Sequence, residues 1–334
     1  MKKIRAYLAV LSFIFLSACG NNKASTPELP TEAMSYTAGN EIVLMDDLLA
    51  ANILDVQSEN PKLPDLNDTK GKSVAFNYTF DDGETIYFMV TDGVVSSGDM
   101  LLGYYDMLVE DIKRHEASLE AQANGIETQA AISGKYCWQR FITCQIFHGR
   151  KWENGIVFWE YPGLTVDEQR QVLRIIREYE RRTDLRFVNR STGKRIIFKR
   201  DGSGCNSWIG QVGGDGQTVN LSAADGCFRD AVIRHEIGHA IGLIHEHQRP
   251  DRDNHINILE QNIRDGQEHN FQRIGRKMAY QTSYDTSSIM QYGSGVFSIG
   301  SETSNPTMTT KGNWRIPYNN DLNANDVRAI NSYY

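Results

Sequence analysis

The feature that most constrains this chain is an eleven-residue window, His235 to His245, which reads His-Glu-Ile-Gly-His-Ala-Ile-Gly-Leu-Ile-His. His235 and His239 are four residues apart, so on a helix both imidazoles lie on one face, one turn from each other. Two imidazoles at that separation can bind one Zn²⁺ at roughly 2.0–2.1 Å. A lone histidine usually belongs to a core or a surface, but this many specified positions in one window are not expected by chance. The window therefore predicts a helix that carries a metal site.

Three further residues of the window complete the predicted site. Glu236 follows the first ligand and would lie beside a metal-bound water, close enough to take its proton. Gly242 allows the positive φ that ends the helix, so that His245 can approach the metal from another direction. Three histidines leave a fourth position for water, and Zn²⁺ lowers the pKa of that water toward about 7. The window thus predicts one Zn²⁺ and hydrolytic chemistry.

The residues that follow the window resemble those of a known family. The metzincin signature is His-Glu-x-x-His-x-x-Gly-x-x-His, and the run His245-Glu246-His247-Gln248-Arg249-Pro250-Asp251-Arg252-Asp253 resembles the astacin extension, H-E-x-x-R-x-D-R-D. Ser288-Ile289-Met290-Gln291-Tyr292 resembles the astacin Met-turn. The resemblance implies a zinc-dependent endopeptidase that hydrolyses peptide bonds in proteins, with Glu236 as its base. Met290 would form the apolar floor beneath the zinc, and Tyr292 would be a fifth, switchable ligand that helps to stabilise the tetrahedral intermediate.

This resemblance covers most of residues 130–334 and implies an α+β fold, an astacin-like catalytic domain split by its active-site cleft. Cys205 and Cys227 resemble the two loop cysteines of the family, which supports a disulfide between them. The residues after Cys205 would then form the edge strand that pairs with extended substrate, namely Asn206, Ser207 and Trp208.

The beginning of this domain also resembles the family. Ala130-Ala131-Ile132 resembles the mature N-terminus, and Trp152-x-x-Gly155-Ile156-Val157 resembles the first strand. In the family, the freed amino group is buried near the glutamate after the third histidine, which is Glu246 here. The family's second disulfide is not expected, because Asp184 stands at the position of its first cysteine.

The N-terminus resembles a bacterial lipoprotein signal. Met1–Arg5 is basic, Ala6–Ala18 is apolar, and the run Leu16-Ser17-Ala18-Cys19-Gly20 resembles a lipobox. Residues 1–18 would be removed, and Cys19 would carry lipid that anchors an exported protein to a membrane of the cell envelope. A plain secretory signal is the alternative. Residues 19–40 are polar and lack apolar periodicity, which predicts a flexible tether.

Cysteine usage agrees with export. If Cys19 is lipidated, four cysteines remain, an even number that favours two disulfides in an exported protein. Three pairings are possible, and we expect the local ones, Cys137–Cys144 and Cys205–Cys227. The alternative for the first pair is a free thiol that could reach the zinc.

Residues 41–129 are predicted to form a small α+β propeptide domain. Ile42–Val56 favours a helix, and the alternating apolar residues from Val74 to Phe80, a turn at Asp81-Asp82-Gly83 and the run Ile86–Val90 predict a hairpin. Apolar residues at helical spacing from Tyr104 predict a second helix toward Asn124. The small polar residues 124–133 read as a linker.

A short motif in this first domain suggests how it acts. Ser96-Ser97-Gly98-Asp99-Met100 resembles the astacin propeptide switch, F-x-G-D-I/M, with Ser96 in place of the phenylalanine. The resemblance implies that Asp99 binds the zinc in place of water and keeps a zymogen latent, and a carboxylate suits Zn²⁺. The alternative is that Gly98-Asp99 is only a turn. Cleavage near Ala130, by another protease or by self-cleavage, would remove the inhibitor and release the enzyme from its anchor.

Further elements are expected in residues 130–334. Thr165 and Glu168 form a capping box before a helix that continues to about Arg182. The window itself predicts a helix over Ala231–Leu243, and the strand candidates are Leu185–Val188, Arg195–Lys199 and Thr218–Ser222. Irregular structure is expected from Gly293 to a last helix near Asn323–Tyr333.

Charge limits the partners. The whole chain carries a net charge of −7, which argues against a nucleic-acid partner. Residues 21–129 hold 6 Lys+Arg and 20 Asp+Glu, whereas residues 130–334 hold 26 and 22, so the first domain is acidic and the second slightly basic. Opposite charges favour attraction between them, although acidic surfaces are also common for solubility alone. The alternative functions are an inactive zinc-binding lipoprotein on a protease fold and a metallohydrolase that acts on a non-peptide bond.

Overall fold

The computed structural model describes residues 70–71, 73–79, 85–106, 109, 151–212, 214–273, 282–300 and 303–334. All of them belong to one compact unit. Within these ranges, no helix is both long enough and apolar enough to span a membrane. Several predicted features lie outside them: the signal peptide 1–18, the tether 19–40, the helix Ile42–Val56, the linker and start at Ala130, nearly all of the helix beyond Tyr104, and Cys19, Cys137 and Cys144.

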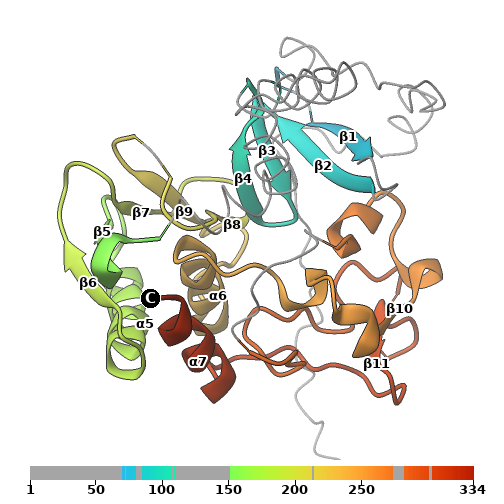
Figure 1. Cartoon of the computed structure of the whole chain (residues 1–334). Coiled ribbons are helices and arrows are strands. Elements are labelled where there is room, and N and C mark those ends of the chain that lie inside the picture. The colour runs from blue at the N-terminus through green and yellow to red at the C-terminus, as the bar shows by residue number, and fades with distance from the viewer. Residues whose placement is uncertain are drawn as a thin grey trace, which may run out of the picture. The chain divides into compact units, whose positions relative to one another are not determined.

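The described residues form an α+β fold, as predicted (Figure 1). Nine strands of the described ranges make one mixed sheet in the order β1-β2-β3-β4-β8-β9-β7-β5-β6. Its strands are β1 (Ser73–Thr79), β2 (Thr85–Thr91), β3 (Val94–Ser97), β4 (Met100–Tyr104), β5 (Ile156–Glu160), β6 (Arg186–Asn189), β7 (Ile196–Lys199), β8 (Cys205–Trp208) and β9 (Gln217–Leu221). The strands expected in residues 185–222 are confirmed to within one residue at each end.

The first four strands form an antiparallel meander. β1 and β2 pair with Ser73 opposite Thr91, which confirms the predicted hairpin. β3 and β4 were not predicted, because both are short and a β-bulge between Val95 and Ser96 interrupts the alternation of side chains. β4 then pairs in parallel with β8, so one sheet continues from the segment 73–104 into the segment 156–221.

In the described part of the chain, three α-helices accompany the sheet: α5 (Val166–Arg182), α6 (Asp230–Ala240) and α7 (Ala324–Tyr333). The predicted capping box starts α5, because the Thr165 hydroxyl accepts from the Glu168 amide and the Glu168 carboxylate accepts from the Thr165 amide. The buried face of α5 includes Val172, Ile175 and Ile176, each of which stabilises the fold by roughly 1.5–3 kcal/mol. All residues of α6 after its first are buried.

The helix expected to reach Leu243 ends at Ala240. Gly242 has a φ of 107°, so the chain leaves the helix where a third metal ligand requires it. Short 3-10 helices follow: η3 (Glu246–Gln248), η4 (Arg252–Asn254), η5 (Glu260–Asn262) and η6 (Glu268–Phe271), while η2 (Glu153–Gly155) precedes β5.

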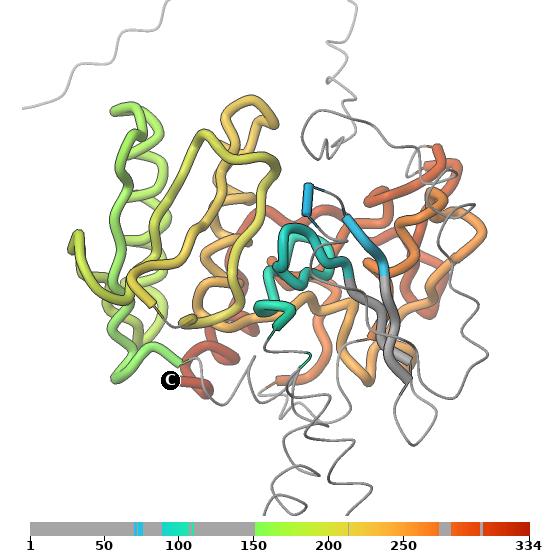
Figure 2. The backbone as a smooth tube through the Cα atoms, turned by 90° about the horizontal axis from the view of Figure 1, so that it is seen from above, coloured from blue at the N-terminus to red at the C-terminus, as the bar shows by residue number. Residues whose placement is uncertain are grey.

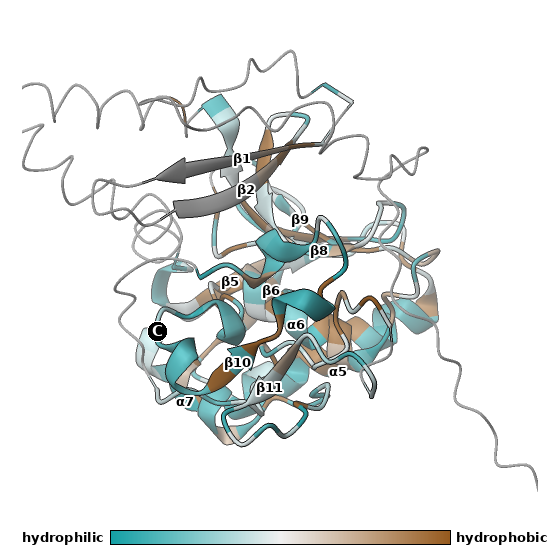
Figure 3. Ribbon diagram, turned by 90° about the vertical axis from the view of Figure 1, so that its right-hand side faces the viewer, coloured by the Kyte–Doolittle hydropathy of each residue, from teal (hydrophilic) through white to brown (hydrophobic). Residues whose placement is uncertain are grey.

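The region expected to be irregular contains a second, small sheet. β10 (Ile256–Ile258) and β11 (Met308–Thr310) pair antiparallel over three residues each. β10 is brown in Figure 3, and Ile256 and Met308 belong to a buried cluster with Tyr292. This cluster gives the C-terminal part of the chain its own core, and it holds Tyr292, the last residue of the Met-turn run, in place.

Candidate active site

Helix α6 and the turn at Gly242 bring the three predicted histidines together. The Nε2 atoms of His235 and His239 are 3.0 Å apart, and the Nε2 atom of His245 lies 3.1 Å from the first and 3.2 Å from the second. All three side chains are buried. Asp99 completes the group, with its Oδ1 atom 2.8 Å from Nε2 of His245 and 3.4 Å from Nε2 of His239, and its Oδ2 atom 3.4 Å from Nε2 of His235. The four residues form one candidate metal site.

The opposite ring nitrogens show whether these residues fit a metal ion. The Nδ1 atoms of His235 and His239 donate to the carbonyl oxygens of Ile289, at 2.9 Å, and Leu243, at 2.8 Å. Carbonyl oxygens only accept hydrogen bonds, so each Nδ1 carries the proton and each Nε2 directs a lone pair at the centre. Lone pairs and a carboxylate at such distances repel one another unless a cation lies among them. Neutral imidazoles with their other N–H held in place are the ligand set that Zn²⁺ prefers.

The carboxylate of Asp99 is held ionised. Burial alone would raise its pKa, but positive charge in this centre, carried first of all by His245 in the absence of a metal ion, outweighs burial and holds the pKa of Asp99 well below its usual range. Glu236 behaves in the opposite way: burial, and then the negative charge of Asp99, raise the pKa of Glu236 well above its usual range. The buried Oε2 atom of Glu236 has no hydrogen-bond partner among the described residues. A buried acceptor without a partner is unusual and indicates a group that faces a ligand or water.

The Met-turn lies against the helix that carries two of the histidines. Met290 is buried, and its carbonyl oxygen accepts from the Glu246 amide at 2.9 Å. Gly238 lies between His235 and His239 in the sequence, and a Cβ atom added there would lie 2.6 Å from the Met290 sulfur. Only glycine therefore allows Met290 to pack this closely against α6. The role of Gly238 was not predicted.

Tyr292 lies next to the histidines. Its hydroxyl is 3.4 Å from Oδ1 of Asp99, and its ring centroid is 4.3 Å from that of His245. Its ring also stacks on that of His247, at 4.2 Å and 27°. His247 is fully buried.

The turn that carries Asp99 lies against the three histidines, and Figure 2 shows the backbone of this teal segment between the yellow strands and the orange C-terminal part of the chain. Gly98 has a φ of 61°, and a Cβ atom there would lie 3.0 Å from the Tyr292 hydroxyl and 3.3 Å from Oδ1 of Asn270. Both the backbone conformation and the close approach therefore require glycine at this position.

The predicted substrate strand is not an edge in this chain. β4 pairs with β8 in parallel, with Met100 opposite Ser207 and Leu101 opposite Trp208. The Ser207 amide donates to the carbonyl oxygen of Asp99 at 3.0 Å. In the full chain β4 thus uses the edge at Asn206, Ser207 and Trp208 that is predicted to pair with substrate, and the pairing with substrate stays a prediction.

The predicted loop disulfide and Glu246, the predicted partner of the mature N-terminus, both lie within the described residues. A disulfide joins Cys205 to Cys227, as expected, and links β8 to the loop before α6. Glu246 accepts from Nη1 of Arg249 at 2.9 Å and from the Asp285 amide at 2.8 Å. Burial, opposed by Arg249, raises the pKa of Glu246 to about 7. Its pairing with the amino group of Ala130 lies outside the described residues and stays a prediction.

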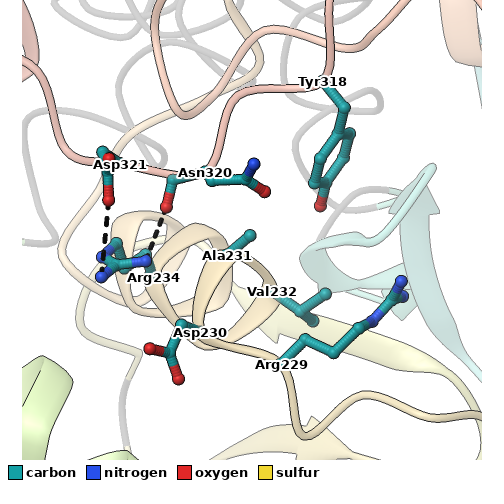
Figure 4. A pocket seen from close by; sticks show the side chains of 8 residues that line it. All are labelled: Arg229, Asp230, Ala231, Val232, Arg234, Tyr318, Asn320 and Asp321. Carbon is teal, nitrogen blue, oxygen red and sulfur yellow. Dashed lines mark hydrogen bonds and ion pairs between the residues drawn. The ribbon is translucent and has the colours of Figure 1, made fainter. Parts of the chain in front are cut away.

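A pocket of about 360 Å³ opens at the start of α6 (Figure 4). Ala231 and Val232 lie one helical turn before His235 and Glu236, so the pocket adjoins the site. Its lining residues are Arg229, Asp230, Ala231, Val232, Arg234, Tyr318, Asn320 and Asp321.

Some charged side chains of this pocket form ion pairs within the described residues, and one does not. Arg234 pairs with Glu178 and Asp321, and Asp230 pairs with Arg174. Arg229 donates to a carbonyl oxygen of Gly226 and has no carboxylate partner in the described part of the chain. Nothing in the sequence pattern marked Arg229 or Tyr318, because about ninety residues separate them.

Comparisons with known proteins agree with this geometry. Residues 145–334 match the model of the astacin family of peptidases. Mouse Tolloid-like protein 2 is 35% identical over 155 residues, which are 45% of this chain and 15% of that protein. Blastula protease 10 of Paracentrotus lividus is 31% identical over 221 residues, 62% of this chain and 36% of that protein.

A solved structure is also similar. High choriolytic enzyme 1, a hatching enzyme zinc-protease from Oryzias latipes, matches with a TM-score of 0.50 and 28% identity over 57% of this chain and 96% of that one. The chain thus spans well under two thirds of the curated relatives named above, but nearly all of this solved chain. Taken with the three histidines, Glu236 and the Met-turn, these matches show that the chain belongs to the astacin family of metallopeptidases.

Proposed function

We propose that residues 130–334 form a zinc-dependent endopeptidase that hydrolyses peptide bonds in proteins. The observation that carries the proposal is the pairing of two features in one buried centre. Three Nε2 atoms converge there, and Glu236 has a buried carboxylate oxygen without a partner among the described residues, near enough for the charge of Asp99 to raise the pKa of Glu236. When bound by His235, His239 and His245, Zn²⁺ would polarise the substrate carbonyl and make a water acidic.

The protein's own residues would carry the remaining steps. Glu236 takes a proton from the attacking water and returns it to the leaving amine, a task suited to a carboxyl group whose pKa burial has raised. The Tyr292 hydroxyl donates a hydrogen bond to the oxyanion that develops on the substrate carbonyl. The amide of Ser207, on β8, binds the extended substrate backbone.

The same proposal includes latency. Asp99 contacts all three histidines, and β4 occupies the edge of β8. Both contacts support an inhibitory role for residues 41–129 in a zymogen. Cleavage near Ala130 would free the cleft and supply the new amino group to Glu246.

Export completes the proposal. The lipobox-like run around Cys19 supports a lipid-anchored bacterial protein of the cell envelope that is released when the propeptide is cut. Sequencing the N-terminus of the released active form tests this point. A start near Ala130 is expected, and a start at Cys19 would contradict it.

The pocket beside α6 supports a preference in the substrate. Arg229 offers a cation with no carboxylate partner in the described residues, about two helical turns before the predicted base. Partial burial raises the pKa of Tyr318 to about 12, with Arg229 opposing the rise and Glu236 and Asp99 adding to it. An acidic side chain next to the scissile bond would therefore be favoured.

Two alternatives are an inactive zinc-binding lipoprotein and a hydrolase that acts on a non-peptide bond. Casein cleavage by processed protein, measured with and without a zinc chelator, separates them from the proposed peptidase. We expect cleavage that the chelator abolishes and added zinc restores. Zinc binding without cleavage would favour the first alternative.

A further inference from the structure

One metal-binding histidine differs from the other two in the group that orients it. Main-chain carbonyl oxygens hold the Nδ1 atoms of His235 and His239, and no side-chain substitution removes a carbonyl. The Nδ1 atom of His245 instead lies 2.9 Å from Oε1 of Gln248. Gln248 is fully buried. The orientation of this third histidine therefore depends on one side chain.

The neighbours of Gln248 decide which way its amide points. Its Nε2 atom lies 3.2 Å from the carbonyl oxygen of Asn270, which can only accept a hydrogen bond. The NH₂ group must face Asn270, so Oε1 faces His245 and accepts from it. His245 then carries its proton on Nδ1 and keeps Nε2 free to bind a metal. The carbonyl oxygen of Asn270 also lies 3.0 Å from Nε2 of His247, so it is held by two side chains, those of His247 and Gln248.

The amide of Gln248 also reaches the first segment of the chain. Its Nε2 atom donates to the hydroxyl oxygen of Ser97 at 3.1 Å, across 151 positions of sequence. Ser97 is buried and lies two residues before Asp99. One side chain thus contacts both a metal-binding histidine and the turn that fills the cleft.

We infer that Gln248 is a positioning residue that fixes His245 as an Nε2 metal ligand and, through Ser97, couples that ligand to residues 94–104. The inference rests on the proposed zinc function. Because the Asn270 carbonyl holds Gln248 independently of Ser97, the positioning persists after residues 94–104 are removed. Ser97 adds a contact that exists only in the uncut chain.

The first test measures zinc affinity of the full-length chain by competition with a chromophoric chelator. Gln248→Met keeps the side-chain volume but removes the acceptor, and we expect zinc to bind about 10–100-fold more weakly. Gln217→Met is the matched control, because Gln217 is a buried glutamine on β9 that accepts from Val212 and donates to Gly210, not to a histidine side chain. We expect its zinc affinity to stay within about threefold of the unsubstituted chain.

A second variant keeps the test valid if the first does not fold. Gln248→Glu retains an acceptor for Nδ1 of His245, so we expect zinc affinity within about threefold of the unsubstituted chain. A loss as large as that expected for Gln248→Met would overturn the inference. Equal zinc affinity of Gln248→Met and the unsubstituted chain would overturn it as well. If the unsubstituted chain itself fails to bind zinc, the proposed function fails instead.

The link to Ser97 is tested by a double-mutant cycle on the thermal unfolding midpoint of the zinc-loaded full-length chain. We expect Ser97→Ala to lower the midpoint alone but to have no further effect in Gln248→Met, since its partner is already gone. Additive effects of the two substitutions would show that Ser97 acts independently and would overturn the coupling.

Discussion

The carbonyl oxygen of Asp99 accepts a hydrogen bond of 3.0 Å from the amide of Ser207, while the side chain of Asp99 faces the three histidines. One residue of the first segment therefore occupies both parts of the site at once. Its carboxylate lies where a fourth metal ligand belongs, and its backbone uses the strand on which an extended substrate is proposed to bind.

The carboxylate of Asp99 predicts a measurable release of activity. Asp99→Asn keeps the shape of the side chain but removes its charge, and a contact to a charged group contributes about 1.5–3 kcal/mol. We expect the uncut chain to cleave a quenched peptide about tenfold faster or more than the unsubstituted uncut chain. Asp92→Asn, in the neighbouring exposed turn, is the control and should change nothing. Mass spectrometry must show that both chains stay uncut, and equal rates would contradict a role for Asp99.

The close packing at Gly98 allows a steric test of the same turn. Gly98→Ala places a methyl group 3.0 Å from the Tyr292 hydroxyl in a left-handed conformation, at a cost of about 1–3 kcal/mol. The segment should be displaced more easily, and the uncut chain should gain activity. Gly71 has a φ of 66° with open space around it, so Gly71→Ala carries backbone strain alone. A similar gain from both variants would mean that the contact with Tyr292 is not responsible.

The disulfide between Cys205 and Cys227 predicts a loss of stability when it is removed. It closes a sequence separation of 22 residues, for which restriction of the unfolded chain corresponds to about 3 kcal/mol. Replacing both cysteines by serine should lower the free energy of unfolding in urea by that amount. Addition of a reductant should then lower the stability of the unsubstituted chain more than that of the variant, in which only the predicted Cys137–Cys144 disulfide remains.

The charge of Arg229 predicts a preference that can be inverted. Arg229→Glu should lower kcat/KM for peptides with an acidic residue next to the scissile bond by about tenfold or more, because an ionic hydrogen bond is replaced by repulsion. Peptides with a basic residue at that position should be cleaved faster. Arg170→Glu is the matched control, since Arg170 lies on α5, pairs with Asp167, and neither residue lines the pocket. A uniform loss for all peptides would mean that Arg229 only supports the fold.

Local patterns made much of the fold predictable. The capping box at Thr165 and Glu168 specified the start of α5, and the spacing of His235 and His239 specified the face of α6. Such signals lie within a few residues of one another, so the sequence alone contains them. The strands β3 and β4 were missed, because short strands with a bulge lack a period long enough to recognise.

Contacts between distant residues could not be predicted in the same way. Gln248 and Ser97 are 151 positions apart, and only the fold brings them together. The Asp184 amide likewise donates to the Asn331 side chain at 2.9 Å across 147 positions, a contact that the sequence did not indicate. The match around Asp99 was partial, since Ser96 replaces a phenylalanine, yet the carboxylate lies among the histidines.

The central claim is that the three histidines hold a catalytic zinc ion on which Glu236 acts as the base. Its most direct test is Glu236→Ala in protein processed near Ala130, with zinc content and peptide hydrolysis measured on the same sample. Because Glu236 is not among the residues that form the metal site, we expect one zinc per chain, as in the unsubstituted protein, and loss of activity by a factor of about 10²–10⁴. A variant that retains both its zinc and its full activity would contradict the account.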